Sequence, residues 1–333
     1  MRSVIIRGDS VAAYCSLHLL RSAGIQAGIE RSDRARVPAI MLSDAALALI
    51  RDVFGRPDLF RDSPRVRRRV VSWGDTKPVA LPHSAVVVSE LFLLDSLRDG
   101  LPIEDPRPSA EPDWTIFTSR PLPPAASEER FGSRTAFAVP VKLKDSADSE
   151  TCWIESMEDG WLFLIPNGPE SAWLLSVGGP ADSLLGHSRL ISEQITSSSG
   201  SSREFPACPR IMSPLCGPEW LACGTAAMAF DPICGDGTAN AVREAILACA
   251  VTRAIDAGGN APELLAHYDA RLIAGFYRHL ALCRQFYESG HKGPWWESEL
   301  AALDRGSEWC ARKAGAVRQF RYQLNGFELQ AVS

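Results

Sequence analysis

Residues Phe230 to Ala245 read FDPICGDGTANAVREA, so that two glycines, Gly235 and Gly237, stand between an Asp-Pro pair and an apolar, helix-like pattern. Glycines at this place let the backbone approach a ligand, because no Cβ is in the way and the first N–H groups of a helix have no partner inside it. The stretch therefore predicts a backbone binding site at a helix N-terminus. An ordinary loop-to-helix junction is the alternative, since such a glycine pair is a weak motif.

The N-terminus predicts a β-α-β unit. SVIIRG (residues 3–8) reads as a buried strand, Val11 to Ala23 as an apolar helix and IQAGIE (residues 25–30) as a second strand. This order is that of a dinucleotide-binding fold, in which the turn after the first strand meets the pyrophosphate.

The turn itself matches the pattern G-x-G-x-x-G/A in part. Gly8 and Ala13 fit the first and third positions, Ser10 replaces the second glycine, and Glu30 ends the second strand. The turn is expected to contact a pyrophosphate at a helix N-terminus, and the acid to bind the ribose hydroxyls. Ser10 should crowd the pyrophosphate or offer it a hydroxyl. A β-α-β unit that only packs is the alternative.

Composition describes an ordinary globular protein. The chain has 333 residues, 46% of them hydrophobic, and a net charge of -5, which gives no general attraction to nucleic acid. The arginines between Arg65 and Arg69 are interpreted as a solvated face or turn rather than a phosphate site. No apolar stretch is long enough for a membrane span and no signal peptide is recognisable, so a cytoplasmic protein is expected. Nine cysteines without a CxxC pair fit a reducing compartment and argue against a zinc or other metal site.

The middle of the chain predicts an antiparallel sheet. Short segments with strand composition alternate with turn residues, at Arg134 to Leu143, Cys152 to Glu155, Trp161 to Ile165 and Trp173 to Val177. Loops are expected at Pro102 to Pro124, around an inner strand at Trp114 to Thr118, and in the Ser-rich stretch Thr196 to Ser202. Another strand is expected at Trp220 to Cys223, and helices are expected to dominate from Ala239 to the end.

Taken together, three segments resemble the FAD-dependent monooxygenase and tryptophan halogenase superfamily, including its branch of flavoprotein modifiers of quinone-cofactor proteins. WLACGTAAMAFDPICGDGTANAVREAILACAVTRAI (residues 220–255) resembles the family's third flavin-binding segment, and SVIIRGDSVAA (residues 3–13) with Glu30 resembles the first. The stretch from 137 to 179 is similar to the substrate-domain sheet. The resemblance implies an α/β, FAD/NAD(P)-binding Rossmann-like fold with an inserted antiparallel sheet and a helical C-terminus.

The same resemblance implies a division of the chain. Residues 1–90 form the first part of the FAD-binding domain, 91–125 its linking strands and loops, 126–205 the substrate domain, 206–260 a further FAD-binding segment and 261–333 a helical region.

The resemblance also implies cofactor contacts at the C-terminal motif. Asp231, Pro232, Gly235 and Gly237 match the residues that bring a helix N-terminus against the flavin in relatives. An Asp follows the glycine after the strand in that family, but here Gly224 is followed by Thr225, whose hydroxyl cannot replace a carboxylate. Because the turn at Ser10 also departs from the family, FAD is expected to be held weakly or to be lost.

The function implied is a flavin-dependent monooxygenase or oxidoreductase, with an aromatic or electron-rich small molecule or protein side chain as substrate. Electrons would come from NAD(P)H or a separate flavin reductase. No histidine is assigned a catalytic role. The alternative is a non-catalytic binding or scaffold protein that kept the fold and lost tight FAD binding.

Halogenation is not expected. WLFLIP (residues 161–166) resembles the W-x-W-x-I-P motif of flavin halogenases with Phe163 at the second tryptophan, and alternating aromatics on a strand more often form one packed face. The lysine that halogenases carry after the second strand has no counterpart in VPAIMLSDAALALI (residues 37–50).

Overall fold

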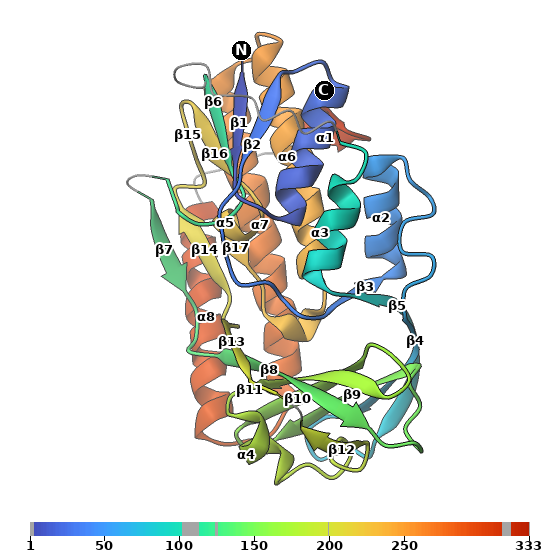
Figure 1. Cartoon of the computed structure of the whole chain (residues 1–333). Coiled ribbons are helices and arrows are strands. Elements are labelled where there is room, and N and C mark those ends of the chain that lie inside the picture. The colour runs from blue at the N-terminus through green and yellow to red at the C-terminus, as the bar shows by residue number, and fades with distance from the viewer. Residues whose placement is uncertain (1–2, 102–112, 124–125, 199, 315–320, 333) are drawn as a thin grey trace.

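The computed structural model describes residues 3–101, 113–123, 126–198, 200–314 and 321–332. The part of the chain that it describes has two large sheets. In Figure 1 a mainly parallel sheet with its helices occupies the upper part of the molecule, and a larger sheet occupies the lower part. The predicted fold class, a Rossmann-like unit with an antiparallel sheet and a helical C-terminus, is confirmed.

The parallel sheet has the order β15-β16-β6-β1-β2, in which only the edge strand β15 is antiparallel. The predicted strand–helix–strand opening is present. Its strands are β1 (Val4–Arg7), β2 (Ala27–Glu30), β6 (Trp114–Phe117), β15 (Cys216–Gly217) and β16 (Trp220–Ala222). Two helices, α1 (Val11–Ser22) and α6 (Gly237–Asp256), pack side by side against this unit.

The larger sheet has the order β12-β8-β11-β10-β9-β4-β5-β3, and β13 pairs with β8. Its central strands are those that the sequence predicted, β8 (Thr135–Leu143), β9 (Thr151–Met157), β10 (Gly160–Pro166) and β11 (Ser171–Val177). The remaining strands are β3 (Ile40–Ser43), β4 (Arg65–Ser72), β5 (Val79–Val88), β12 (Ile195–Ser198) and β13 (Arg203–Pro206).

Three strands from the N-terminal part join this sheet, which the sequence did not indicate. Of the two interpretations of the arginine run, a solvated face or a turn, the structure has the first, because the run lies in β4 and Arg67 and Arg68 are exposed to solvent. They pair with Glu150 (3.1 Å) and Asp148 (2.6 Å) beside the parallel pairing of β4 with β9. The Ser-rich stretch also begins in a strand, β12, because its residues pair with β8. Part of the predicted loop from 102 to 124 lies outside the described residues.

The two faces of β10 belong to different cores. Trp161 and Phe163 face the core shared with the parallel sheet, whereas Leu162 and Leu164 face a second core under α4. This alternation is the period of two expected for a strand buried on both sides. Trp296 packs in the first of these cores, where it is fully buried and its Nε1–H donates to Met157 O at 3.0 Å.

Two long helices run along both parts of the molecule (Figure 1). They are α7 (Ala261–Glu288) and α8 (Pro294–Ala314). The shorter helices are α2 (Asp44–Phe54), α3 (Glu90–Arg98), α4 (Ala181–Leu185), α5 (Gly224–Ala227) and the 3-10 turn η1 (Pro232–Cys234). The small strands are β7 (Ser127–Arg130), β14 (Arg210–Ser213), β17 (Met228–Ala229), β18 (Tyr322–Asn325) and β19 (Glu328–Ala331). Within the described ranges, no helix is both long and apolar enough to cross a bilayer.

Candidate functional site

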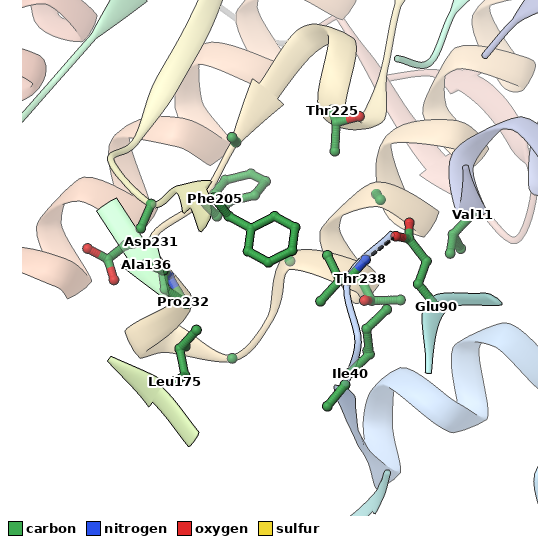
Figure 2. Close-up of a pocket in the computed structure, with 18 of the residues that line it drawn as sticks. Val11, Ile40, Glu90, Ala136, Leu175, Phe205, Thr225, Asp231, Pro232 and Thr238 are labelled. Atoms are coloured by element: carbon green, nitrogen blue, oxygen red, sulfur yellow. Dashed lines mark hydrogen bonds between the residues drawn. The ribbon is translucent and has the colours of Figure 1, made fainter. Parts of the chain in front are cut away.

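A cavity of about 430 Å³ lies where the parallel sheet and the larger sheet meet. One wall comes from the N-terminus of α1 and the segment that joins α5 to α6. The opposite wall comes from β3, β8, β10, β11 and β13. Figure 2 shows Phe205 projecting into the middle of this cavity, with Asp231 and Pro232 on one side and Thr238 on the other.

The sheet side of the cavity is apolar. Five large side chains form it, Phe163 and Ile165 from β10, Trp173 and Leu175 from β11, and Phe205 from β13. Phe163 and Ile165 are buried, as the strand pattern predicted, and they also line the cavity. An apolar wall of this kind favours a flat hydrophobic or aromatic ligand.

At the first predicted motif, the glycine is required by close packing. Gly8 has φ +126°, and a Cβ there would lie 2.4 Å from Ser119 Oγ. Ser10 lines the cavity, and its Oγ accepts from the N–H of Ala13 at 3.2 Å, which caps α1. The hydroxyl that stands in place of the second glycine therefore satisfies one donor of the helix itself.

Two arginines stand at this same helix end. Arg36 pairs with the Asp9 carboxylate, and both Arg34 Nε (3.2 Å) and Arg36 Nη1 (2.8 Å) donate to Asp9 O. Arg34 lines the cavity and also pairs with Glu90, which accepts from the N–H of Val37 at 2.8 Å. Guanidinium groups beside a helix N-terminus suit a phosphate group.

Glu30 lies at the end of β2, where it is opposite Arg7 in the register with β1. Its carboxylate accepts from Arg7 Nε at 3.0 Å and is exposed, and its backbone carbonyl accepts from the N–H of Gly8 at 2.9 Å. Glu30 is thus beside the first motif but is not among the residues that line the cavity.

The predicted pair Gly224 and Thr225 begins α5 on the cavity wall. Gly224 has φ +58°, and a Cβ there would lie 2.8 Å from the Cβ of Ala12, so this glycine permits close contact between α5 and α1. The Thr225 hydroxyl donates to Thr118 O at 3.2 Å.

Asp231 lines the cavity with its backbone, while its carboxylate points away from Phe205 (Figure 2). Its Oδ2 lies 3.0 Å from Arg134 Nε, and both side chains are fully buried. The Tyr287 hydroxyl donates to the same oxygen at 2.9 Å, and Oδ1 accepts from the N–H of Ile233 at 2.9 Å. These contacts of the Asp231 carboxylate fix the Asp-Pro turn on the side away from the cavity. Pro232 begins η1 on the cavity side.

Gly235 and Gly237 border open space in the cavity. Gly235 has φ +64°, and a Cβ at either position would meet no atom within 4 Å. Asp236, at the N-cap position of α6, makes no side-chain cap and instead pairs with Arg243 at 2.9 Å. The first N–H groups of a 20-residue helix thus lack a side-chain cap where Gly237 and Thr238 line the cavity.

Glu244 is a buried acid on α6 that the sequence analysis missed. Its Oε2 accepts from the N–H of Gly224 at 2.7 Å, whereas Oε1 has no hydrogen-bond partner among the described residues. Burial raises the pKa of Glu244 to about 8, although the Gly224 N–H opposes this shift. Glu244 is therefore mostly protonated at neutral pH, and it lines the cavity.

The arginines that the sequence analysis missed follow Glu30 in the stretch RSDRARVP, where basic residues directly after a ribose-binding acid were a usable signal. Phe205 and Glu244 carried no such signal. Phe205 belongs to a strand of only four residues, and Glu244 stands beside Arg243 in what reads as a solvated charge pair.

The residues present fit a flavin nucleotide. The α6 N-terminus and the bare backbone at Gly235 and Gly237 suit the electron-rich edge of a planar ring, and the α1 N-terminus with Arg34 and Arg36 suits a pyrophosphate. The fit is poorest at Ser10, whose side chain stands where a phosphate would approach.

Comparison with solved structures gives the same fold. The peptidyl tryptophan dihydroxylase QhpG, essential for tryptophylquinone cofactor biogenesis, is 18% identical with a TM-score of 0.72, covering 99% of this chain and 86% of that one. The flavin-dependent halogenase CmlS is 18% identical with a TM-score of 0.71, covering 94% and 71%. The myxobacterial chondrochloren halogenase CndH, a variant of the FAD-dependent halogenases, is 14% identical with a TM-score of 0.73, covering 94% and 90%.

No protein-family model matches the sequence, and no curated protein matches it. The expected resemblance is thus confirmed at the level of the fold: the chain has the fold of the FAD-dependent monooxygenases and halogenases.

Proposed function

We propose that this protein is an FAD-dependent monooxygenase that oxidises an aromatic ring. The observation that carries the proposal is one cavity with two unlike walls. The uncapped N-terminus of α6 with Gly235 and Gly237 faces an apolar wall that contains Phe163, Phe205 and Trp173. A cofactor ring on the first wall and a substrate ring on the second would lie against each other.

The residues have separate roles in this proposal. Glu30 would hold the ribose. Arg34 and Arg36, at the α1 N-terminus, would exchange their hydrogen bonds to Asp9 for hydrogen bonds to the pyrophosphate. The N–H groups of Gly237 and Thr238, at the start of α6, would hold the flavin ring. When bound and reduced, FAD supplies the capacity to activate dioxygen.

The apolar wall orients the substrate and excludes water. Phe205 lies in the centre of the cavity and would stack on a flat ring, and Ile165 and Leu175 add to the apolar lining. Because QhpG is a dihydroxylase of peptidyl tryptophan, an aromatic side chain of another protein is one substrate class for this cavity. A free aromatic metabolite is the other.

Hydroxylation is favoured over halogenation by the residues at the expected lysine region. Val37, Ile40 and Met41 from this region line the cavity. The wall is therefore apolar at the place where a halogenase would have the amine of its lysine.

The test supplies the purified chain with reduced FAD, dioxygen and chloride or bromide, together with free tryptophan and tryptophan-containing peptides. Mass spectrometry should show addition of oxygen to an aromatic ring and no halogenated product. A halogenated indole would contradict the proposal. Turnover should also be lost in Phe205→Ala, whereas Leu324→Ala, a change at an exposed residue of β18, should have no effect.

A binding or scaffold protein without FAD remains the second candidate, and one observation favours it. Ser10 and Thr225 replace two residues that anchor FAD in the family that the sequence resembles, and the Thr225 hydroxyl is engaged with Thr118 O. Absence of saturable FAD binding together with an intact fold would select this candidate.

A further inference from the structure

Two thiols from distant parts of the chain meet behind the segment that carries Gly235 and Gly237. Cys234 is the last residue of η1, and Cys283 lies on α7. Their Sγ atoms are 3.5 Å apart. Cys283 is fully buried, whereas Cys234 is partly exposed.

His279 completes this cluster, with its Nε2 3.2 Å from Cys283 Sγ. Nε2 also accepts from the N–H of Asp231 at 2.9 Å. Burial, together with the charge of Arg134, lowers the pKa of His279 to about 3, so the ring is neutral and its one lone pair is taken by that N–H. A metal ion on Nε2 would leave a buried N–H without a partner, which is costly. The geometry therefore favours a reaction between the two sulfurs over metal binding.

Cys234 is reached from a second cavity, of about 510 Å³. This cavity shares Met228, Phe230 and Glu244 with the first one, so the two cavities adjoin. Three arginines also line it, Arg243, Arg271 and Arg278.

We propose that Cys234 and Cys283 are a modification site, at which hydrogen peroxide converts the two thiols reversibly into a disulfide. The sulfur of Cys234 attacks one oxygen of the peroxide, the O–O bond breaks, and a sulfenic acid and one water form. The sulfur of Cys283 then attacks the sulfur of Cys234, the S–O bond breaks, and the leaving hydroxide takes the Cys283 proton as a second water. Two thiols lose two electrons, and one peroxide gains them.

The bond would tie the edge of the candidate flavin site to α7. Because a disulfide has an S–S length of about 2.05 Å, the sulfurs must approach by roughly 1.5 Å. Helix α7 is anchored in the core by Tyr287 and Phe276, whereas η1 is one short turn followed by Gly235 in open space. Asp231 at the start of the turn is fixed by Arg134 and Tyr287, so the end of the turn at Cys234 should move and take Gly235 and Gly237 away from the first cavity. This consequence rests on the proposed function.

The first test uses the full chain, reduced and then treated with hydrogen peroxide. Titration of thiols in denaturant should fall from nine to seven, and dithiothreitol should restore nine. Peptide mass spectrometry should find one linked pair, Cys234 with Cys283, lighter by two hydrogen atoms than the free peptides. An unchanged thiol count, or a linkage between other cysteines, would overturn the proposal.

Three variants sharpen the test. Cys234→Ser and Cys283→Ser each leave eight thiols and should lose none to an intramolecular disulfide. Cys216→Ser is the matched control, because Cys216 is also partly exposed, and it should still lose two thiols. A disulfide that persists in Cys234→Ser would contradict the assignment.

A separate measurement addresses the consequence for the cavity. FAD affinity of the wild-type chain should be lower after peroxide than after dithiothreitol, and it should not change in Cys283→Ser. Equal affinities in a chain whose disulfide has been mapped would overturn the link to the flavin site and leave the disulfide standing. A chain that binds no FAD in either form would instead refute the proposed function.

Discussion

Arg134 Nε lies 3.0 Å from Asp231 Oδ2, and neither side chain is exposed to solvent. Nη1 of the same guanidinium lies 2.9 Å from Glu299 Oε2, and the guanidinium lies over the ring of Tyr287 at 4.6 Å from its centroid. Asp231, which begins the Asp-Pro turn, is thus joined to Arg134, the residue before β8, and through it to Glu299 of α8. The position of the turn at the cavity is therefore determined by a buried ionic network.

Asp231→Asn should destabilise the fold, because it leaves the buried Arg134 with one carboxylate instead of two. Loss of one partner of a buried ion pair costs about 3 kcal/mol or more. Urea unfolding would measure the change. The control is Asp236→Asn, which breaks the exposed pair with Arg243 and should cost less than about 1 kcal/mol. Equal effects of the two variants would show that the buried network does not hold the turn.

Stability should fall between pH 6.5 and pH 8 because of Glu244. Its pKa is raised to about 8 in the fold and is near its ordinary value in the unfolded chain, so the folded state holds more protons in this window. Integration over the window gives a loss of about 1.5 kcal/mol of unfolding free energy. Glu244→Gln stays uncharged throughout and should lack this loss. A wild-type chain with the same pH profile as Glu244→Gln would contradict the shift.

Glu30→Ala should weaken FAD binding by about 1.5 to 3 kcal/mol, the range for a hydrogen bond to a charged group. The fold should be almost unaffected, since the pair of Glu30 with Arg7 is exposed and such pairs contribute little. Arg7→Ala serves as the control, because it breaks the same ion pair and keeps the acid. FAD affinity that is equal in Glu30→Ala and wild type would remove Glu30 from the site.

The double variant Ser10→Gly with Thr225→Asp should strengthen FAD binding more than about tenfold, or 1.4 kcal/mol. The first change removes a side chain from the cavity wall and costs only a few tenths of a kcal/mol in capping of α1. The second supplies the carboxylate that the resembled family uses. Fluorescence titration of both single variants would show whether the gains add. Unchanged or weaker binding in the double variant would mean that neither residue limits affinity.

The sequence predicted the elements that have a strong period or a backbone signature. The β-α-β opening follows from SVIIRG and from the glycine at Gly8, and the four central strands of the larger sheet follow from short alternating segments between turns. These features are local, so a few consecutive residues carry them. The arginine strand β4 was missed because its charged side chains gave no strand pattern and its pairing partner in β9 is 83 residues further along the chain.

The sequence predicted the part of the site that depends on the backbone, and it did not predict the part where side chains from distant segments meet. Gly235 and Gly237 were expected at a helix N-terminus, and in the structure they line the cavity at the start of α6. The direction of the Asp231 carboxylate depends on Arg134 and Tyr287, which lie far away in sequence. A carboxylate beside a motif can serve a ligand or a buried network, and sequence spacing does not distinguish the two.

We propose that a flavin lies against the start of α6, and a titration of the protein with FAD tests this placement. FAD is added to wild type and to Gly237→Leu, and binding is followed by the flavin absorbance. A Cβ at Gly237 meets no atom within 4 Å, and Leu favours helix more than Gly, so the variant should fold at least as well while its side chain fills the cavity. Wild type should bind one FAD per chain with a Kd of roughly micromolar, or about -8 kcal/mol, and the variant should bind none. No saturable binding to wild type, or equal binding to both proteins, would contradict the account.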